Sequence, residues 1–341
     1  MSATLAQAQQ IMSSYGLSIF YILGTIGNFL LICIFLQPTH RRNPCSLYLL
    51  ATAIVNFILI QCVLPLSVYS AYHTDPQNVS MIWCKIRSYL FNSLLMIYRW
   101  NKTAACIDRA AMCSRYVRIR AFSHVRIARR IIFIIIFVWV TIPVHLAVYF
   151  RIESGHCMPS QTAYAKFFSF YSIAVSGWSP ALAMAIFGII AYRNLKMIRA
   201  NVHRLDHADR MAIDRGNNLY QQGLTSKRIG QRDQQSVLLL VCEVVLYICT
   251  NLLYSINITY SAITADISKS VERIAIEWFI AYISTPFLVI INNCAPFYLY
   301  LFVSSRFRQD VKRFLTKCCY TARVVPQPGN LASIAARQQT R

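Results

Sequence analysis

The sequence predicts an all-α membrane protein, a bundle of seven membrane-spanning helices followed by a short amphipathic eighth helix. Of its 341 residues, 56% are hydrophobic and only 13% are charged. About seven stretches reach the roughly 20 apolar residues that a helix needs to cross the hydrocarbon core of a bilayer. The 34 Lys and Arg residues, against 12 Asp and Glu, fall between these stretches. Cations that bind nucleic acid should lie on a folded polar module, so the charge favours a membrane and argues against nucleic acid.

The apolar stretches divide the chain into a lead, a membrane domain and a tail. Residues 1–14 are uncharged and are expected to form an extracellular N-terminus. The membrane domain is expected over residues 15–303, with an amphipathic helix at 304–317 and a cytoplasmic tail at 318–341. The spans are predicted at about 15–36, 46–71, 84–114, 131–150, 163–194, 235–261 and 275–303.

The distribution of cations predicts the orientation of the bundle. Cytoplasmic loops of membrane proteins are enriched in Lys and Arg. The stretches on one side hold 25 of the 34 Lys and Arg residues, whereas cations and acids balance on the other side. We therefore expect a multi-pass protein with its N-terminus outside and its C-terminus inside the cell. The basic stretches are 37–45, 114–130, 193–234 and 304–341.

Three features of the outer loops follow from this orientation. Cys84 and Cys157 are the cysteines of the expected extracellular stretches, where an oxidising compartment favours a disulfide between them. Two unpaired thiols are the alternative. Asn78 begins an Asn-Val-Ser sequon in an outer loop and is a glycosylation candidate. The sequons at Asn101 and Asn257 lie within expected spans and are interpreted as chance matches.

A basic, amphipathic run follows the last span. Phe307, Val311 and Phe314 share one helical face while basic residues occupy the other, as in a helix that lies in the membrane interface. Cys318 and Cys319 follow it and are candidates for S-palmitoylation. A solvated, charged tail is the alternative.

The third span carries the most informative motif. Arg109 lies 25 residues after Cys84, about 38 Å along a helix, so the two residues mark opposite faces of the membrane. The Asp108-Arg109-Ala110 triplet resembles the Asp-Arg-Tyr motif of rhodopsin-class G protein-coupled receptors. The resemblance covers nearly the whole chain. Helix-packing positions of that family are matched by Asn28, Asn56, Trp139, Pro180, Asn292, Pro296 and Tyr300.

The resemblance includes departures from the family pattern. Asn56 stands where most members have an aspartate that helps to hold a sodium ion, and the sixth span contains neither Trp nor Pro. Near the end of the seventh span, either Pro296 or Tyr300 matches the Asn-Pro-x-x-Tyr motif, and both alignments remain open. The runs at 43–50 and 297–300 are most similar to divergent invertebrate FMRFamide-type and related neuropeptide receptors.

The resemblance implies a plasma-membrane receptor that transduces an extracellular ligand into activation of a heterotrimeric G protein, with no catalytic residues, metal or cofactor. Asp108 is then expected to hold Arg109 in the resting state, and an outward movement of the sixth span releases Arg109 to the G protein. A juxtamembrane arginine that only obeys the positive-inside rule is the alternative. The basic loop at 193–234 suits either a G protein or anionic lipid.

Two cations inside the third span require an explanation. Arg99 and Lys102 lie deep in the membrane, where charges need partners. Glu243 is the acid within another span, so an ion pair between the third and sixth spans is the hypothesis. Snorkelling, or exposure to a watery cavity, is the alternative. With Asn56 neutral and two cations nearby, we expect the central cavity to repel sodium.

Absences narrow the ligand class. Residues 84–107 contain no acid to clasp a protonated amine, and no lysine follows Lys269 in the seventh span to form a retinal Schiff base. A peptide or another small signal remains. Arg87 is expected to attract an acidic ligand group and Glu277 a basic one, although both are alternatively ordinary rim residues. The pocket candidates are Arg87, Phe91, Tyr171, Ser172, Ser176, Tyr254 and Glu277.

A transporter or channel is the rival from another class, because Arg99, Lys102 and Glu243 are the kind of residues that line an ion pathway. Transporters often carry internal repeats with broken helices at matching positions. The sequence shows no such self-similarity, which favours the receptor.

Overall fold

The computed structural model describes residues 2–153, 155–159, 163–213, 220–264 and 267–324. Side chains are described within 4–153, 155–159, 163–197, 238–264 and 267–316. The chain divides into two compact units, residues 1–299 and 300–341, which are treated separately.

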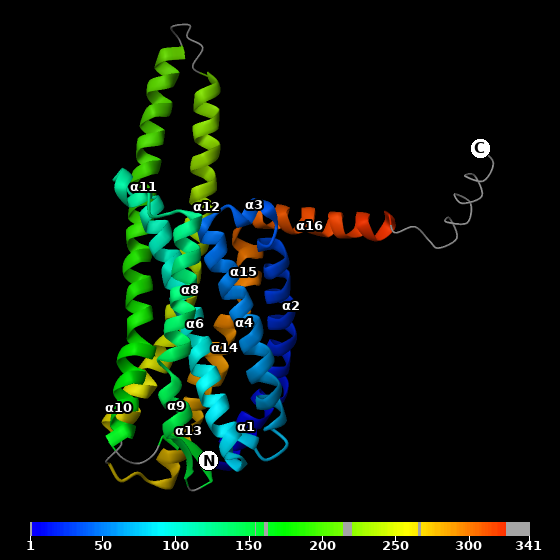
Figure 1. Cartoon of the computed structure of the whole chain (residues 1–341), viewed down its shortest axis with the longest axis vertical. Coiled ribbons are helices and arrows are strands. Elements are labelled where there is room, and N and C mark those ends of the chain that lie inside the picture. Colours follow the sequence, from blue (N-terminus) through cyan, green and yellow to red (C-terminus); the bar gives the residue numbers. More distant parts are fainter. Residues whose placement is uncertain (1, 154, 160–162, 214–219, 265–266, 325–341) are drawn as a thin grey trace, which may run out of the picture. The chain divides into compact units, whose positions relative to one another are not determined.

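The first unit is a helical bundle, as the sequence predicts. Six of its described helical stretches are long and apolar enough to cross a membrane: Thr4–Phe35, Pro44–Tyr69, Val125–Tyr149, Ala163–Met197, Leu238–Ile263 and Val271–Cys294. A further helix of 32 residues, α6 (Met81–Met112), contains Arg99, Lys102, Asp108 and Arg109 and is not one of the six. The helices of this unit run side by side along its length (Figure 1).

The bundle begins with a continuous helical rod. It comprises α1 (Ser2–Ile11), the π-helix η1 (Met12–Gly16) and α2 (Leu17–Phe35). Helix therefore begins at Ser2, well before the predicted start of the first span. The elements that follow are α3 (Pro38–Arg41), α4 (Pro44–Tyr69), α5 (Pro76–Val79), α6, α7 (Val117–Arg120), α8 (Val125–Thr141) and α9 (Val144–Tyr149).

The elements after residue 149 include long helices that are interrupted by the π-helical segments η2 and η3. Two strands, β1 (Phe150–Glu153) and β2 (His156–Pro159), separate the halves. They are followed by α10 (Ala163–Tyr171), η2 (Ser172–Trp178), α11 (Ser179–Ile213), α12 (Tyr220–Ile263), α13 (Val271–Tyr282), η3 (Ile283–Phe287), α14 (Leu288–Cys294) and α15 (Pro296–Val303).

Several helix starts are encoded locally. Asn43 accepts a hydrogen bond from the Cys45 N–H at the start of α4, and Asp75 accepts one from the Gln77 N–H at the start of α5. In each case proline follows the capping residue, at the position where a helix needs no N–H donor. The caps fix where α4 and α5 begin, and with them the loop that leads into α6.

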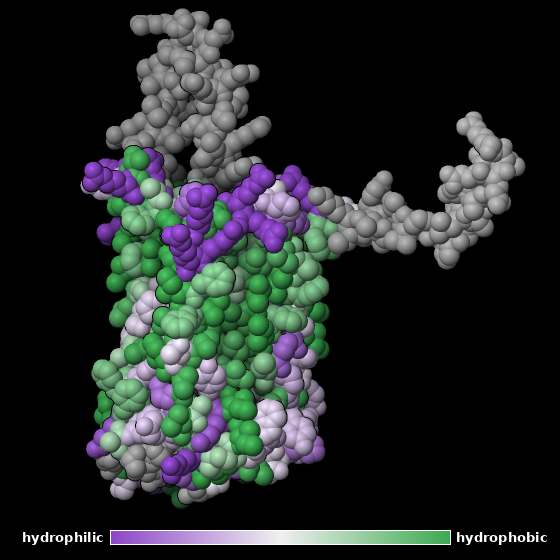
Figure 2. Space-filling model, viewed as in Figure 1, coloured by the Kyte–Doolittle hydropathy of each residue, from purple (hydrophilic) through white to green (hydrophobic). Residues whose placement is uncertain are grey.

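Helix α6 packs against α4, α8, α9 and α11, so it lies in the interior of the bundle. Its residues Leu95 and Met96 belong to a core with Leu59 and Ile60 of α4 and Tyr247 of α12. On the outside, apolar side chains cover the middle of the unit, while hydrophilic residues gather toward its ends (Figure 2). Such a surface suits a lipid solvent.

The strands correct the expectation of an all-α fold. They form an antiparallel hairpin with Phe150 opposite Pro159 and Glu153 opposite His156. Gly155 in its turn has φ +77°, a conformation that glycine adopts without steric cost. The hairpin contains Cys157, which is joined by a disulfide to Cys84 in the first turn of α6.

The second unit contains the end of α15 and the whole of α16 (Ser305–Val324), which covers residues 305–317 of the amphipathic segment predicted at 304–317. Phe307 is buried with its ring 5.5 Å from the ring of Tyr300, while Lys312 and Arg313 are exposed. The side chains of Cys318 and Cys319 lie outside the described residues.

Candidate functional site

A cavity of about 560 Å³ opens among α4, α6, α12 and η3, toward the N-terminal end of α6. This volume is typical of pockets for small ligands. Of the predicted pocket residues, Arg87, Phe91, Ser172 and Tyr254 line it. The wall is completed by Val63, Ser67, Gln77, Ser88, Asn92, Leu146, Phe150, Pro159, Phe168, Ser169, Ile258, Ser261, Ala262, Thr285, Pro286 and Ile290.

The other three predicted pocket residues have different positions. Tyr171 donates a hydrogen bond to Asn92 and supports the wall from behind. Ser176 is fully buried beneath the cavity. Glu277 does not line the cavity; its carboxylate lies 2.6 Å from Lys269 Nζ and 3.0 Å from Arg273 Nε. Two cations near the start of α13 therefore bind Glu277, which stands apart from this cavity, and its attraction for a basic ligand group stays a prediction.

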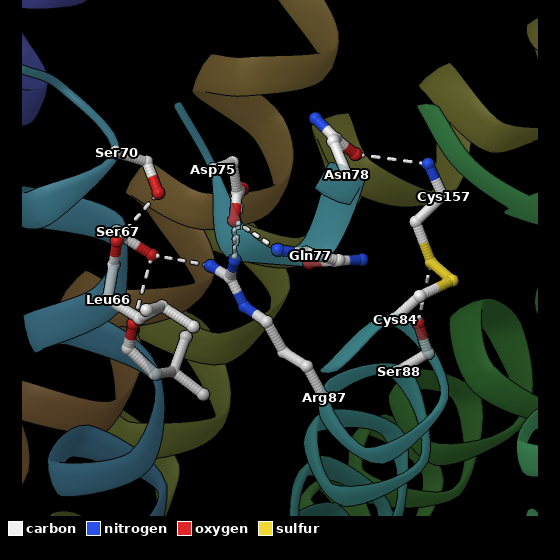
Figure 3. A network of polar contacts seen from close by, with 11 residues as sticks. Leu66, Ser67, Ser70, Asp75, Gln77, Asn78, Cys84, Arg87, Ser88 and Cys157 are labelled. Carbon is white, nitrogen blue, oxygen red and sulfur yellow. Dashed lines mark hydrogen bonds and ion pairs between the residues drawn. A yellow bond between two sulfur atoms is a disulfide. The ribbon is translucent and has the colours of Figure 1, made fainter. Parts of the chain in front are cut away.

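Arg87 is held near the N-terminal end of α6 by two neighbouring segments (Figure 3). Its Nη1 donates to both carboxylate oxygens of Asp75 at 3.1 Å, and its Nη2 donates to Ser67 Oγ at 3.0 Å. Asp75 precedes α5 and Ser67 lies on α4. The guanidinium therefore joins the segment between α4 and α6 to the bundle.

The predicted disulfide between Cys84 and Cys157 is confirmed (Figure 3). It joins α6 to the hairpin, two of whose residues, Phe150 and Pro159, line the cavity. Asn78, the predicted glycosylation site, accepts a hydrogen bond from the Cys157 N–H at 3.0 Å. The hairpin is thus fixed over the mouth of the cavity.

The two buried cations of α6 have separate partners. Lys102 Nζ lies 3.6 Å from Glu243 Oε1 of α12, and both side chains are 2% exposed. Arg99 instead donates to Asn251 Oδ1 at 2.9 Å and to the Ser176 carbonyl. Its guanidinium also lies over the rings of Tyr247 and Tyr254. None of these charged side chains lines the cavity, which argues against the rival ion pathway.

The sequence gives no signal for the carbonyl partner of Arg99. Ser176 lies in η2, a π-helical segment, where the regular hydrogen-bond pattern of the α-helix is interrupted. Interruption of this pattern leaves a backbone carbonyl for a side chain to reach. Gly177, the next residue, allows close approach, since a Cβ there would lie 3.2 Å from Ser255 Oγ.

At the C-terminal end of α6, Arg109 Nη2 lies 3.7 Å from Asp108 Oδ2. Two further residues, which the sequence reasoning missed, hold this pair. Asn43 accepts from Arg109 Nη2 at 2.7 Å, and Ser123 donates to Asp108 Oδ1 at 2.8 Å. Arg109 is almost completely buried, so its charge is compensated within the bundle.

The predicted helix-packing residues are mostly buried contacts between helices. Asn28 and Asn56 both donate to the Asn293 carbonyl, at 3.1 and 3.3 Å, and so join α2 and α4 to α14. Trp139 of α8 stacks on Trp100 of α6. Asn292 accepts from Tyr98 at 3.5 Å. Pro180 lies just after η2, Pro296 begins α15, and Tyr300 belongs to the second unit.

These contacts sharpen the prediction about sodium. The polar centre of the bundle holds a neutral Asn56 and the ammonium of Lys102, which lies 4.8 Å from the centre of the Tyr98 ring. Glu243 offsets the charge of Lys102, but Arg99 on the same helix has uncharged hydrogen-bond partners, so a positive charge remains at the centre and a sodium ion would be repelled. The melting temperature of the purified chain should be equal in sodium chloride and in N-methylglucamine chloride. A rise specific to sodium would contradict this, and the Asn56→Asp/Lys102→Met variant should show such a rise.

Residues 27–297 match the family described as the 7 transmembrane receptor (rhodopsin family). The chain therefore belongs to the rhodopsin family of seven-transmembrane receptors. It is similar to human neuromedin-U receptor 1, 26% identical over 109 residues, and to mouse neuromedin-U receptor 2, 24% identical over 115 residues. It is also 32% identical over 74 residues to the chimpanzee probable G-protein coupled receptor 34. These matches cover 31%, 34% and 22% of this chain, but only 26%, 29% and 19% of the relatives.

Proposed function

We propose that this chain is a plasma-membrane G protein-coupled receptor that binds an extracellular peptide in the cavity and activates a cytoplasmic heterotrimeric G protein. The observation that carries the proposal is the arrangement along α6, in a chain of the rhodopsin family. The ligand cavity and the disulfide lie near one end of this helix, and the Asp108–Arg109 pair lies at the other. Helix α6 thus connects the ligand cavity to Arg109, which activation releases from Asp108.

The proposal adds α6, the third span in chain order, to the six more apolar stretches, which gives seven spans. Its charged residues exclude α6 from the spans that hydropathy alone identifies. The buried partners of Arg99 and Lys102 lower the cost of placing these two charges inside a membrane. The N-terminus is then outside and the C-terminus inside, in line with the basic inner loops. α16 serves as the amphipathic eighth helix in the membrane interface, with palmitoylation at Cys318 and Cys319 and glycosylation at Asn78 as accompanying modifications.

A peptide ligand is supported by the names of the neuromedin-U receptors and by the lack of an acid in residues 84–107 of α6. The finer assignment to the invertebrate FMRFamide-type receptors rests on the short runs at 43–50 and 297–300. In activation, α12 moves away from α6, Arg109 leaves Asp108 and Asn43, and its guanidinium contacts the G protein.

The test is nucleotide exchange in cells that express the chain with a promiscuous G protein. We expect a peptide from a panel of synthetic neuropeptides, offered as amides and as free acids, to raise exchange. Arg109→Ala should abolish the response at equal surface expression, because it removes the guanidinium that is proposed to contact the G protein. Tags at the two termini should be accessible from opposite sides of intact cells. Accessibility from one side, or a response that survives in Arg109→Ala, would overturn the proposal.

A further inference from the structure

The chemistry of the cavity wall limits what it can bind. Arg87 is the charged residue among the described residues that line the cavity, and the deeper wall is rich in apolar side chains such as Phe91, Ile258 and Ile290. Arg87 lies one helical turn above Phe91 on α6, nearer the outer end. The cavity thus combines an apolar body with one cation near its mouth.

A second cavity meets the first at this cation. It has a volume of about 580 Å³ and is lined by Gln9, Gln10, Ser13, Ser70, Asp75 and Tyr282, among others. Ser67, Arg87 and Pro286 line both cavities. Arg87 therefore borders both cavities, whereas its partner Asp75 borders only the second. No acidic residue is among the described residues that line the first cavity.

Arg87 retains capacity for another partner. Nη1 is directed at the Asp75 carboxylate and Nη2 donates once to Ser67. The other guanidinium N–H groups have no hydrogen-bond partner among the described residues. The side chain is 16% exposed and that of Asp75 is 26% exposed, so solvent and solutes reach the pair. An arginine has five N–H donors in a planar fork that matches a carboxylate.

We propose that the cavity selects a peptide whose inserted end carries a carboxylate beside bulky apolar side chains, and that Arg87 binds this carboxylate. The inference rests on the proposed function for its choice of a peptide, and it names the chemistry that the site recognises. Asp75 already pairs with Arg87 and is an internal competitor for it. The ligand carboxylate either joins Asp75 on the guanidinium or displaces it, while its apolar side chains fill the space toward Phe91 and Ile290.

The test measures binding directly, without a G protein. Three matched probes are used with the purified full-length chain, in ligand-observed NMR: N-acetyl-Phe-Phe as its free acid, the same dipeptide as its amide, and N-acetyl-Phe-agmatine, which ends in a guanidinium. We expect the acid to bind about tenfold more tightly than the amide, since a hydrogen bond to a charged partner contributes more than one to a neutral partner. The cationic probe should bind more weakly still.

Two variants separate recognition from scaffolding. Arg87→Gln should remove the preference for the acid, whereas Arg87→Lys should keep part of it. Asp75→Asn retains the side-chain oxygen that caps α5 but loses the competing charge, so it should bind the acid about threefold or more tightly and leave the amide unchanged. The melting temperature of each variant checks that it is folded.

Four results would overturn the inference: equal binding of acid and amide, tighter binding of the cationic probe, undetectable binding of the acid by the unaltered chain, and an acid preference that survives in Arg87→Gln. Palmitate, tested in parallel, distinguishes a lipid carboxylate from a peptide one, and tighter binding of palmitate than of the dipeptide acid would overturn the choice of a peptide. The inference and the proposed function can fail separately, because the preference for the acid is measured without nucleotide exchange. Exchange that is evoked by a carboxylate-free peptide would refute only the inference.

Discussion

Replacing Glu243 by glutamine is expected to raise ligand-independent nucleotide exchange several-fold, up to about tenfold. The variant leaves the Lys102 ammonium without its counter-charge at a site that is 2% exposed. Breaking a buried ion pair costs on the order of 3–5 kcal/mol. If activation separates α12 from α6, part of this cost destabilises the resting state and not the active state. A difference of about 1–3 kcal/mol between the two states changes the ratio of their populations by about 5–150-fold.

A double-mutant cycle tests whether the effect belongs to the pair. Lys102→Met should also raise basal exchange, and the Lys102→Met/Glu243→Gln variant should exceed the more active single variant by little, because both changes remove one interaction. Glu277→Gln serves as the control, since that acid pairs with Lys269 and Arg273 near the other end of α12. Unchanged or lower basal exchange at equal surface expression, or strictly additive effects, would refute a restraint by this pair.

Removing the disulfide is expected to produce the second large effect. Cys84→Ala or Cys157→Ala should lower the melting temperature by about 5 °C and weaken binding at the cavity about tenfold or more. The bond closes a loop with a sequence separation of 73, for which the chain-entropy estimate is about 4 kcal/mol. Helices that are already inserted in a bilayer have less freedom to lose, so the actual stabilisation should be smaller than this estimate.

The loss of binding has a separate cause from the loss of stability. Without the bond, the hairpin with Phe150 and Pro159 is no longer tied to the outer end of α6, and both residues line the cavity. Cys62→Ala removes an exposed thiol from α4 and is the matched control, with no expected change in either measurement. An unaltered melting temperature in Cys84→Ala would show that other contacts hold the hairpin.

Sequence reasoning succeeded where a residue had few possible partners. Cys84 and Cys157 were the cysteines of the oxidising side, so position alone paired them. Glu243 was the acid within another span, and the structure places it beside Lys102. In both cases one candidate partner remained, because of the oxidising compartment for the cysteines and the low dielectric for the charges. The pairing could therefore be predicted without knowledge of the three-dimensional arrangement.

The remaining contacts depend on geometry that periodicity does not encode. Arg99 reaches the Ser176 carbonyl because η2 departs from α-helical hydrogen bonding, and no side-chain motif announces such a departure. Arg109 reaches Asn43, a helix cap far away in the sequence. Glu277 was misplaced because depth along a span was inferred from the sequence, whereas its orientation follows from Lys269 and Arg273 beside it.

The cations of α6 also bear on how the protein is made. The six more apolar stretches are each long and apolar enough to cross a membrane, but α6 carries Arg99 and Lys102 in its middle. Their partners Asn251 and Glu243 belong to α12, which leaves the ribosome about 140 residues later. We therefore expect nascent α6 to remain at the translocon, with its cations hydrated, until α12 arrives, so that chains truncated before α12 are retained and degraded in the endoplasmic reticulum.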